Sequence, residues 1–162
     1  MRRIGAAAAQ RARAFGLDIH WHGPRPKPDL PYVYHDAIGD LAEAVDFLLL
    51  TCPGGPATDG LINDAVLRKL GPRGFLINIA RGSVIDEPAM IRALRDGAIA
   101  GAALDVFPNE PHVSPELLAL ENVILEPHIA STTVETRQAI GDLMFANLVA
   151  HFERRPLPSR VI

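Results

Sequence analysis

Arg81, Asp105, Glu110 and His128 each lie just beyond a short apolar segment with the composition of a buried β-strand. In a parallel α/β sheet, ligands bind outside the carboxyl ends of the strands, so these four side chains are expected to meet at one edge of the sheet. A fixed cation, two carboxylates and an imidazole can together bind an anion and move a proton. The four residues therefore predict an anion-binding site with acid–base chemistry.

Each of the four residues also has an ordinary structural explanation. His128 alone would be a hydrogen-bonded loop residue, and Arg81 alone would be a surface ion pair that adds little stability. Asp105 could cap a turn, and Glu110, which precedes a proline, could simply end a loop. The functional interpretation therefore depends on all four occurring together.

The composition excludes several classes of protein. The chain has 162 residues, enough for one domain with a hydrophobic core, and its 48% hydrophobic and 22% charged residues are typical of soluble globular proteins. A net charge of -3 does not favour binding to nucleic acid or to an anionic membrane. The single cysteine, Cys52, cannot form an internal disulfide and favours a reducing, cytoplasmic location. No apolar run is long enough to span a membrane, and the histidines lack metal-ligand spacing, so no metal site is predicted.

Strand and helix patterns alternate along the chain, which predicts a parallel, doubly wound α/β sheet. The expected strands are 17–21, 47–52, 75–79, 99–106 and 123–125. Three expected helices are given by their ranges, 4–15, 37–45 and 115–120. Two more are expected from their caps: one is capped by Asn63 and ends at 70, and the other is capped by Asp86 and stopped by Gly97. A long helix is expected from a capping box at 132–135 to about 152. In the first helix, Ile4, Ala8, Ala12 and Phe15 share one face.

The first strand of a nucleotide-binding unit is missing from this pattern. The first expected helix begins within about three residues of Met1. Gly5 can be the last glycine of a G-x-G-x-x-G turn, but the middle position falls at Arg2, whose Cβ obstructs approach to a pyrophosphate. We therefore expect residues 1–130 to form a Rossmann-like domain without its first strand, followed by a C-terminal helix and tail at 131–162.

Three motifs, in order, resemble those of the D-isomer-specific 2-hydroxyacid dehydrogenase family, in its C-terminal half. They are LINIARGSVIDE at 76–87, AGAALDVFPNEP at 100–111 and NVILEPHIASTTVETR at 122–137, and Arg3-Ile4-Gly5 resembles the end of that family's glycine motif. The Pro-Gly-Gly turn after Cys52 and the His-Gly loop are most similar to the glyoxylate and hydroxypyruvate reductase branch.

The resemblance implies a role for each residue of the predicted site. Arg81 would hold the substrate carboxylate through its planar fork. His128 would give a proton to the keto oxygen, and Glu110 would orient His128 and raise its pKa so that it is protonated for reduction. Asp105 would bind the nicotinamide carboxamide.

The resemblance also implies a cofactor site. Arg3, Ile4 and Gly5 would lie against the pyrophosphate, Cys52 and Pro53 would flank the adenosine, and Ala80 and Arg81 would also contact the cofactor. NAD enzymes place an acid after the second strand to bind the ribose hydroxyl. This sequence instead has His22-Gly23-Pro24-Arg25 with Lys27 beyond, which favours NADP over NAD, although Arg25 and Lys27 are equally well explained as solvated charges.

Two functions compete for the chain as a whole. The first is an enzyme that reduces a small 2-keto acid such as glyoxylate or hydroxypyruvate. The second is a non-catalytic chain, either truncated or one half of a split enzyme, whose partner would be a second copy or a missing N-terminal half. A nucleotide-binding module is disfavoured because the phosphate turn is the incomplete part. Because strands beside a missing strand lack ladder partners, we expect the 162-residue chain alone to lack useful turnover and to be poorly stable or associate.

Overall fold

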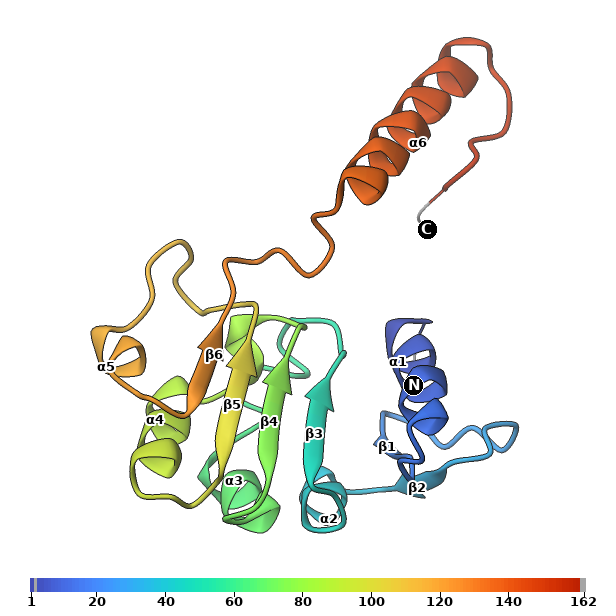
Figure 1. Ribbon diagram of the computed structural model, residues 1–162. Coiled ribbons are helices and arrows are strands. Elements are labelled where there is room, and N and C mark those ends of the chain that lie inside the picture. Colours follow the sequence, from blue (N-terminus) through green and yellow to red (C-terminus); the bar gives the residue numbers. More distant parts are fainter. Residues whose placement is uncertain (2, 161–162) are drawn as a thin grey trace. The chain divides into compact units, whose positions relative to one another are not determined.

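The computed structural model describes Met1 and residues 3–160, which form two compact units. The first unit, Met1–Pro127, contains all the strands, and the second, His128–Ile162, contains the long helix α6 (Val134–Phe152). The first unit is an α/β structure whose strands pair in parallel, as the alternation of patterns predicted (Figure 1).

The main sheet has four parallel strands in the order β3-β4-β5-β6. These are β3 (Phe47–Leu50), β4 (Phe75–Asn78), β5 (Gly101–Leu104) and β6 (Val123–Leu125). The predicted strands 47–52 and 99–106 are shorter than expected, because both ladders end opposite Asn78, where β4 stops. The carboxyl ends of three neighbouring strands therefore lie together at one edge of the sheet.

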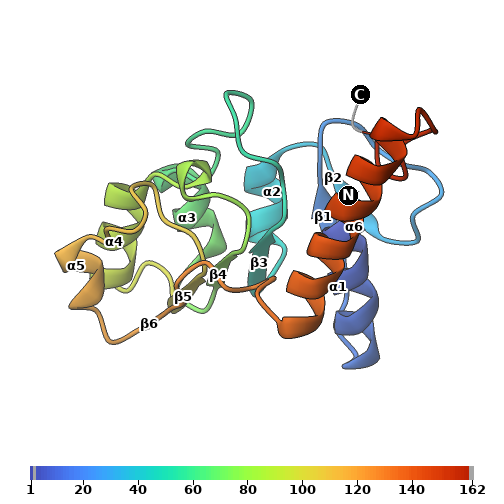
Figure 2. The ribbon, with the colours of Figure 1, turned by 90° about the horizontal axis from the view of Figure 1, so that it is seen from above.

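One face of this sheet carries the hydrophobic core. Leu48, Leu76 and Leu104 are buried on it against α2 (Ile38–Glu43), α3 (Asp64–Leu70) and α4 (Glu87–Arg95). Figure 2 shows α3 and α4 on the same side of the strands. On the opposite face Phe47 and Phe75 stack with ring centroids 5.4 Å apart and stay 53% and 40% exposed. The short helix α5 (Pro115–Leu118) precedes β6.

A second, two-stranded parallel sheet consists of β1 (His20–His22) and β2 (Val33–His35). The predicted strand 17–21 is displaced toward the C-terminus, because a ladder forms only where β2 supplies partners, from His20 opposite Val33 to His22 opposite His35. Among the described residues, no strand pairs with both β1 and β3, so the two sheets are separate. The strands on either side of the predicted gap thus lack partners there.

The first helix, α1 (Arg3–Ala14), buries a different face from the predicted one. Its buried residues are Gly5 and Ala9, whereas Ile4 is 61% exposed and Phe15, beyond the helix end, is 87% exposed. The small residues are buried because the helix packs closely: a Cβ on Gly5 would lie 2.8 Å from Oγ1 of Thr51. Close approach, rather than apolar area, selects the packed face.

The helix caps follow the sequence with one exception. Asn63 Oδ1 accepts a hydrogen bond from Val66 N, and Asp86 Oδ1 accepts one from Ala89 N, which confirms both predicted N-caps. The cap of α6 is Thr133, whose Oγ1 accepts from Thr136 N, so the predicted capping box at 132–135 is one residue too early.

The helix α6 exposes apolar side chains around much of its surface. One apolar stripe of this helix is exposed, from 45% for Leu143 to 81% for Phe152, and consists of Ile140, Leu143, Met144, Leu148 and Phe152. The tail returns to the helix, where Asn147 Nδ2 donates to Ser159 Oγ at 2.8 Å. Within the described part of the chain, no helix combines the length and apolarity needed to cross a membrane.

Candidate active site

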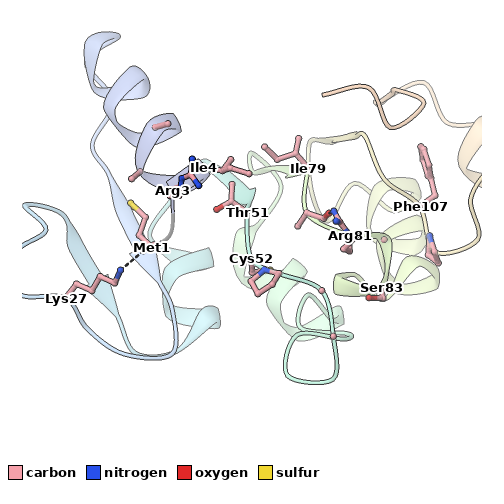
Figure 3. A pocket seen from close by; sticks show the side chains of 18 of the residues that line it. Met1, Arg3, Ile4, Lys27, Thr51, Cys52, Ile79, Arg81, Ser83 and Phe107 are labelled. Atoms are coloured by element: carbon pink, nitrogen blue, oxygen red, sulfur yellow. Dashed lines mark hydrogen bonds between the residues drawn. The ribbon is translucent and has the colours of Figure 1, made fainter. Parts of the chain in front are cut away.

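A cavity of about 1750 Å³ opens at the carboxyl ends of β3 and β4. Figure 3 shows that Arg3 and Ile4 of α1 border it on one side and Ile79 and Arg81 on the other, with Thr51 between them. Its lining includes most of the predicted cofactor residues, namely Arg3, Ile4, Cys52, Pro53, Ala80 and Arg81. Residues from three separate segments thus meet in one place.

The N-terminus of α1 is suited to an anion at this cavity. The first N–H groups of a helix have no partner within the helix, and the helix dipole favours negative charge there. Arg3 and Ile4 belong to this first turn and line the cavity, and Gly5 allows the turn to lie against Thr51. The first turn therefore offers backbone donors to an anion such as a pyrophosphate, and Arg2, which the sequence predicted to obstruct it, lies outside the described residues.

Asn78, the last residue of β4, holds the turn that presents Arg81. Its side chain is fully buried; Oδ1 accepts from Ala80 N at 2.9 Å and Nδ2 donates to the Arg81 carbonyl at 3.0 Å. Arg81 Nη1 donates to the Ala80 carbonyl at 2.6 Å. The arginine side chain lies across Gly54, where a Cβ would be 2.7 Å from Arg81 Cγ.

The loop that carries Glu110 packs against the same turn. A Cβ on Gly82 would lie 2.0 Å from the carbonyl carbon of Phe107, so the two loops touch through their backbones. Glu110 Oε1 accepts a hydrogen bond from Phe107 N at 2.9 Å, which fixes the carboxylate to this loop. Arg81 and Glu110 therefore belong to adjoining loops at the ends of neighbouring strands β4 and β5.

Asp105 directly follows β5 and is 7% exposed. Asp105 and Asn78 are the buried polar side chains of the part of the chain that the structure describes, and the Asp105 N–H donates to the Asn78 carbonyl at 3.0 Å. Asp105 is not part of the cavity lining. This backbone bond places Asp105 beside the Arg81 turn, and its contact with a cofactor stays a prediction.

His128 has a backbone conformation that few residues other than glycine adopt, with φ of 54°. Histidine tolerates this left-handed region better than most residues, and such strain gathers at functional sites. His128 begins the second unit, whereas Arg81 and Glu110 belong to the first. That Glu110 orients His128 stays a prediction.

The fold and motif order agree with a known family. Residues 1–130 match the model of the family described as D-isomer specific 2-hydroxyacid dehydrogenase, NAD binding domain. The chain belongs to this family.

Several relatives within the dehydrogenase family are similar over 99% of this chain. The hydroxyphenylpyruvate reductase of Plectranthus scutellarioides is 46% identical, and a glyoxylate/hydroxypyruvate reductase of Arabidopsis thaliana is 47% identical. The NADPH-dependent glyoxylate/hydroxypyruvate reductase of Sinorhizobium meliloti, solved with NADP and malonate, is 45% identical with a TM-score of 0.91. The match covers 51% of each of the first two proteins and 53% of the third, so the chain spans about half their length.

The two cations of the predicted cofactor loop, Lys27 and Arg25, differ in position. Lys27 lines the cavity, and its Nζ donates to the Met1 carbonyl at 2.9 Å. Arg25 is exposed and lies outside the lining. Within the described residues, no group of three histidines, cysteines or carboxylates is arranged to hold a metal ion.

Sequence reasoning overlooked three residues that shape the candidate site. Asn78, Gly54 and Gly82 set the position of Arg81 and its contact with the Glu110 loop. Asn78 could have been found as a lone polar residue in an apolar strand. The two glycines give no such signal, because the atoms that pack against them, the Arg81 side chain and the Phe107 backbone, belong to distant parts of the sequence.

Proposed function

We propose that the polypeptide to which this chain belongs reduces a small 2-keto acid, of the glyoxylate or hydroxypyruvate type, to the 2-hydroxy acid, with NADPH preferred. The observation that carries the proposal is the placement of Arg81 at the cavity, with its turn fixed by Asn78 and its side chain over Gly54. A small substrate with one carboxylate needs one such planar cation.

Arg81 binds the carboxylate and thereby orients the neighbouring keto group. A guanidinium offers parallel N–H donors that match the two oxygens of a carboxylate, so it fixes direction as well as charge. The Asn78 bonds keep the Arg81 backbone in place, which limits the conformations that the side chain must lose on binding.

His128 donates the proton that the keto oxygen takes up on reduction, and it accepts a proton in the reverse reaction. Glu110 would orient the imidazole of His128 for this proton transfer. A bound nicotinamide cofactor supplies the hydride.

The cofactor would be held by the first turn of α1 through Arg3 and Ile4, by Cys52 and Pro53 near the adenosine, by Ala80, and by Asp105 near the nicotinamide. NADP is favoured because residues 23–27, directly after β1, contain no acid, and because Lys27 lies at the cavity with Arg25 two residues before it. We assign the protein to the cytoplasm because its single cysteine suits a reducing compartment.

The second candidate is a chain that acts only with a partner, either a second copy or an N-terminal half. It is supported by one edge each of β1 and β3, which have no ladder partner in the described part of the chain, and by the half-length match to the relatives. In this case the same residues contribute to a site that another polypeptide completes.

The test joins this chain to the N-terminal half of a relative that supplies the absent part, and follows the oxidation of NADPH and of NADH with glyoxylate and with hydroxypyruvate. Turnover of about 1 per second or more is expected, with NADPH the more efficient donor. Arg81→Lys keeps the charge but loses the fork, so KM for the keto acid should rise at least tenfold, by about 1.4 kcal/mol of binding. Arg95→Lys, on α4, is the matched control.

Two results would contradict the proposal. An active hybrid in which Arg81→Lys leaves KM unchanged would show that Arg81 does not bind the carboxylate. Equal or better efficiency with NADH would refute the interpretation of Arg25 and Lys27 as residues that favour NADPH. The variants Arg25→Gln and Lys27→Gln test each residue singly, with Arg73→Gln as the control.

A further inference from the structure

Two loops that follow β3 and β4 form one side of the cavity. Residues 53–60, called the glycine loop below, follow β3, and the first three of them line the cavity. Residues 81–84, called the arginine turn below, follow β4, and their first three also line the cavity. Figure 3 shows Arg81 and Ser83 on the same side of it. The position of the glycine loop against the arginine turn therefore shapes the cavity wall.

The glycine loop is closed on itself by Thr58. Thr58 Oγ1 donates a hydrogen bond to the Pro53 carbonyl at 2.7 Å, and the Thr58 N–H donates to the Gly55 carbonyl at 2.8 Å. These two bonds tie the cavity-lining beginning of the loop to its far end. A displacement of the far end should therefore be passed on to the residues that line the cavity.

Asp59, the neighbour of Thr58, joins this far end to the arginine turn. Ser83 Oγ donates to Asp59 Oδ1 at 2.7 Å, a short bond of the kind that ionised carboxylates accept. The Gly60 N–H donates to the Ser83 carbonyl at 2.8 Å, so Ser83 is bound through its side chain and its backbone together. Asp59 is not part of the cavity lining, and any effect on a bound molecule must pass through its neighbours.

The side chain of Arg81 rests on the glycine loop. A Cβ on Gly54 would lie 2.7 Å from Arg81 Cγ, which places the loop backbone directly against the stem of the arginine. The buried amide of Asn78 fixes the backbone of Arg81 but does not touch its guanidinium. The direction of the guanidinium therefore depends on where the glycine loop lies.

We propose that Asp59 is a positioning residue for substrate binding. Through Ser83 it holds the glycine loop against the arginine turn, and the loop in turn sets the direction in which Arg81 presents its guanidinium. This inference rests on the proposed function, because it takes Arg81 as the residue that binds the keto acid. A hydrogen bond at the surface thus acts on a site that its carboxylate does not reach.

Hydrogen exchange of the 162-residue chain tests whether Asp59 holds the loop. Asp59→Ala removes the acceptor, so the amides of Thr58 and Gly60 should exchange at least about threefold faster. Asp59→Asn keeps an oxygen that can accept from Ser83 and should leave both rates unchanged. The matched control is Asp40→Ala, which removes an exposed carboxylate that accepts from Lys69 Nζ. Equal exchange in Asp59→Ala and in the unaltered chain would overturn the proposal.

Steady-state kinetics of the hybrid enzyme tests whether the loop positions Arg81. Asp59→Ala and Ser83→Ala should each raise KM for glyoxylate about threefold to tenfold with kcat nearly unchanged, as expected for one hydrogen bond of ordinary net strength. Asp59→Asn should restore KM to within about twofold of the unaltered hybrid, because the acceptor is kept. A purely structural role would lower the urea midpoint of Asp59→Ala without raising KM, and that result would overturn the proposal.

The double variant separates positioning from direct contact. If both residues act through their shared bond, Asp59→Ala combined with Ser83→Ala should raise KM no further than either change alone. Additive effects would show that Ser83 contacts a bound molecule on its own, and would overturn the role of Asp59. An unaltered hybrid without turnover would contradict the proposed function instead, whereas the exchange rates of Thr58 and Gly60 would still decide whether Asp59 holds the loop.

Discussion

Asn78 and Arg81 are joined by a hydrogen bond from the buried amide of Asn78 to the Arg81 carbonyl, at 3.0 Å. The other end of the same amide accepts the N–H of Ala80, so one side chain closes the whole turn after β4. The residue proposed to bind substrate is thus placed by a neighbour that never touches the cavity. This separation of positioning from binding leads to distinct effects of substitution.

Asn78→Ala should destabilise the chain by about 2–4 kcal/mol, because it removes two hydrogen bonds and leaves a space in the core. In the hybrid enzyme it should also raise KM for the keto acid, since the Arg81 turn loses its support. Asn122→Ala is the control: Asn122 Nδ2 donates to the Leu94 and Ala100 carbonyls, away from Arg81. Urea unfolding and steady-state kinetics should show a stability loss in both variants but a higher KM only in the first. A similar KM change in both would contradict the positioning role.

Gly82→Ala, at the cavity, should be more damaging than Gly39→Ala, which lies in α2 away from the cavity. A Cβ there would lie 2.0 Å from the Phe107 carbonyl carbon and 2.2 Å from Pro108 N, and these backbone atoms cannot move without displacing the Glu110 loop. The expected loss is about 3 kcal/mol in urea unfolding. Gly39→Ala, whose Cβ would meet only the flexible end of Lys69, should change stability by about 0.5 kcal/mol or less. Equal losses in both variants would show that the contact with Phe107 is not tight.

Local signals in the sequence predicted local structure well. The caps at Asn63 and Asp86 depend on residues three positions apart, and both are confirmed. The arrival of Arg81 at the end of β4 follows from the strand pattern alone. These features could be predicted because the atoms involved are close in sequence as well as in space.

Features that depend on distant residues were predicted less well. The buried face of α1 was assigned to Ile4 and its neighbours, whereas the packing against Thr51 selects Gly5 and Ala9. The start of β1 was placed too early because its ladder depends on where β2 lies. In both cases an apolar pattern was present, but the partner that decides between its faces or registers is remote in sequence.

Gly54→Ala should weaken substrate binding at little cost in stability, whereas the main effect of Gly82→Ala should be a loss of stability. The new Cβ would meet Arg81 Cγ at 2.7 Å, and a flexible side chain can move away at a cost of about 1 kcal/mol or less. The displaced guanidinium should then bind the keto acid more weakly, with KM raised and kcat less affected in the hybrid enzyme. Unchanged KM together with unchanged stability would show that Arg81 does not depend on this contact.

Cys52 provides a single-site test of the cavity, because the chain contains no other cysteine. Burial raises the pKa of its thiol, and the residue lines the cavity. The folded chain should therefore react with iodoacetamide at pH 7.5 more slowly than the same chain in urea. In the hybrid enzyme, NADPH should slow the labelling of Cys52 further.

The raised pKa of Cys52 also makes stability depend on pH. Above the ordinary thiol pKa of about 8.5 the unfolded chain ionises first, so the free energy of unfolding falls as pH rises beyond that value. Cys52→Ser should remove both the labelling and this alkaline component. Equal labelling rates in folded and unfolded chain would contradict the raised pKa, and labelling unaffected by NADPH would place the cofactor away from Cys52.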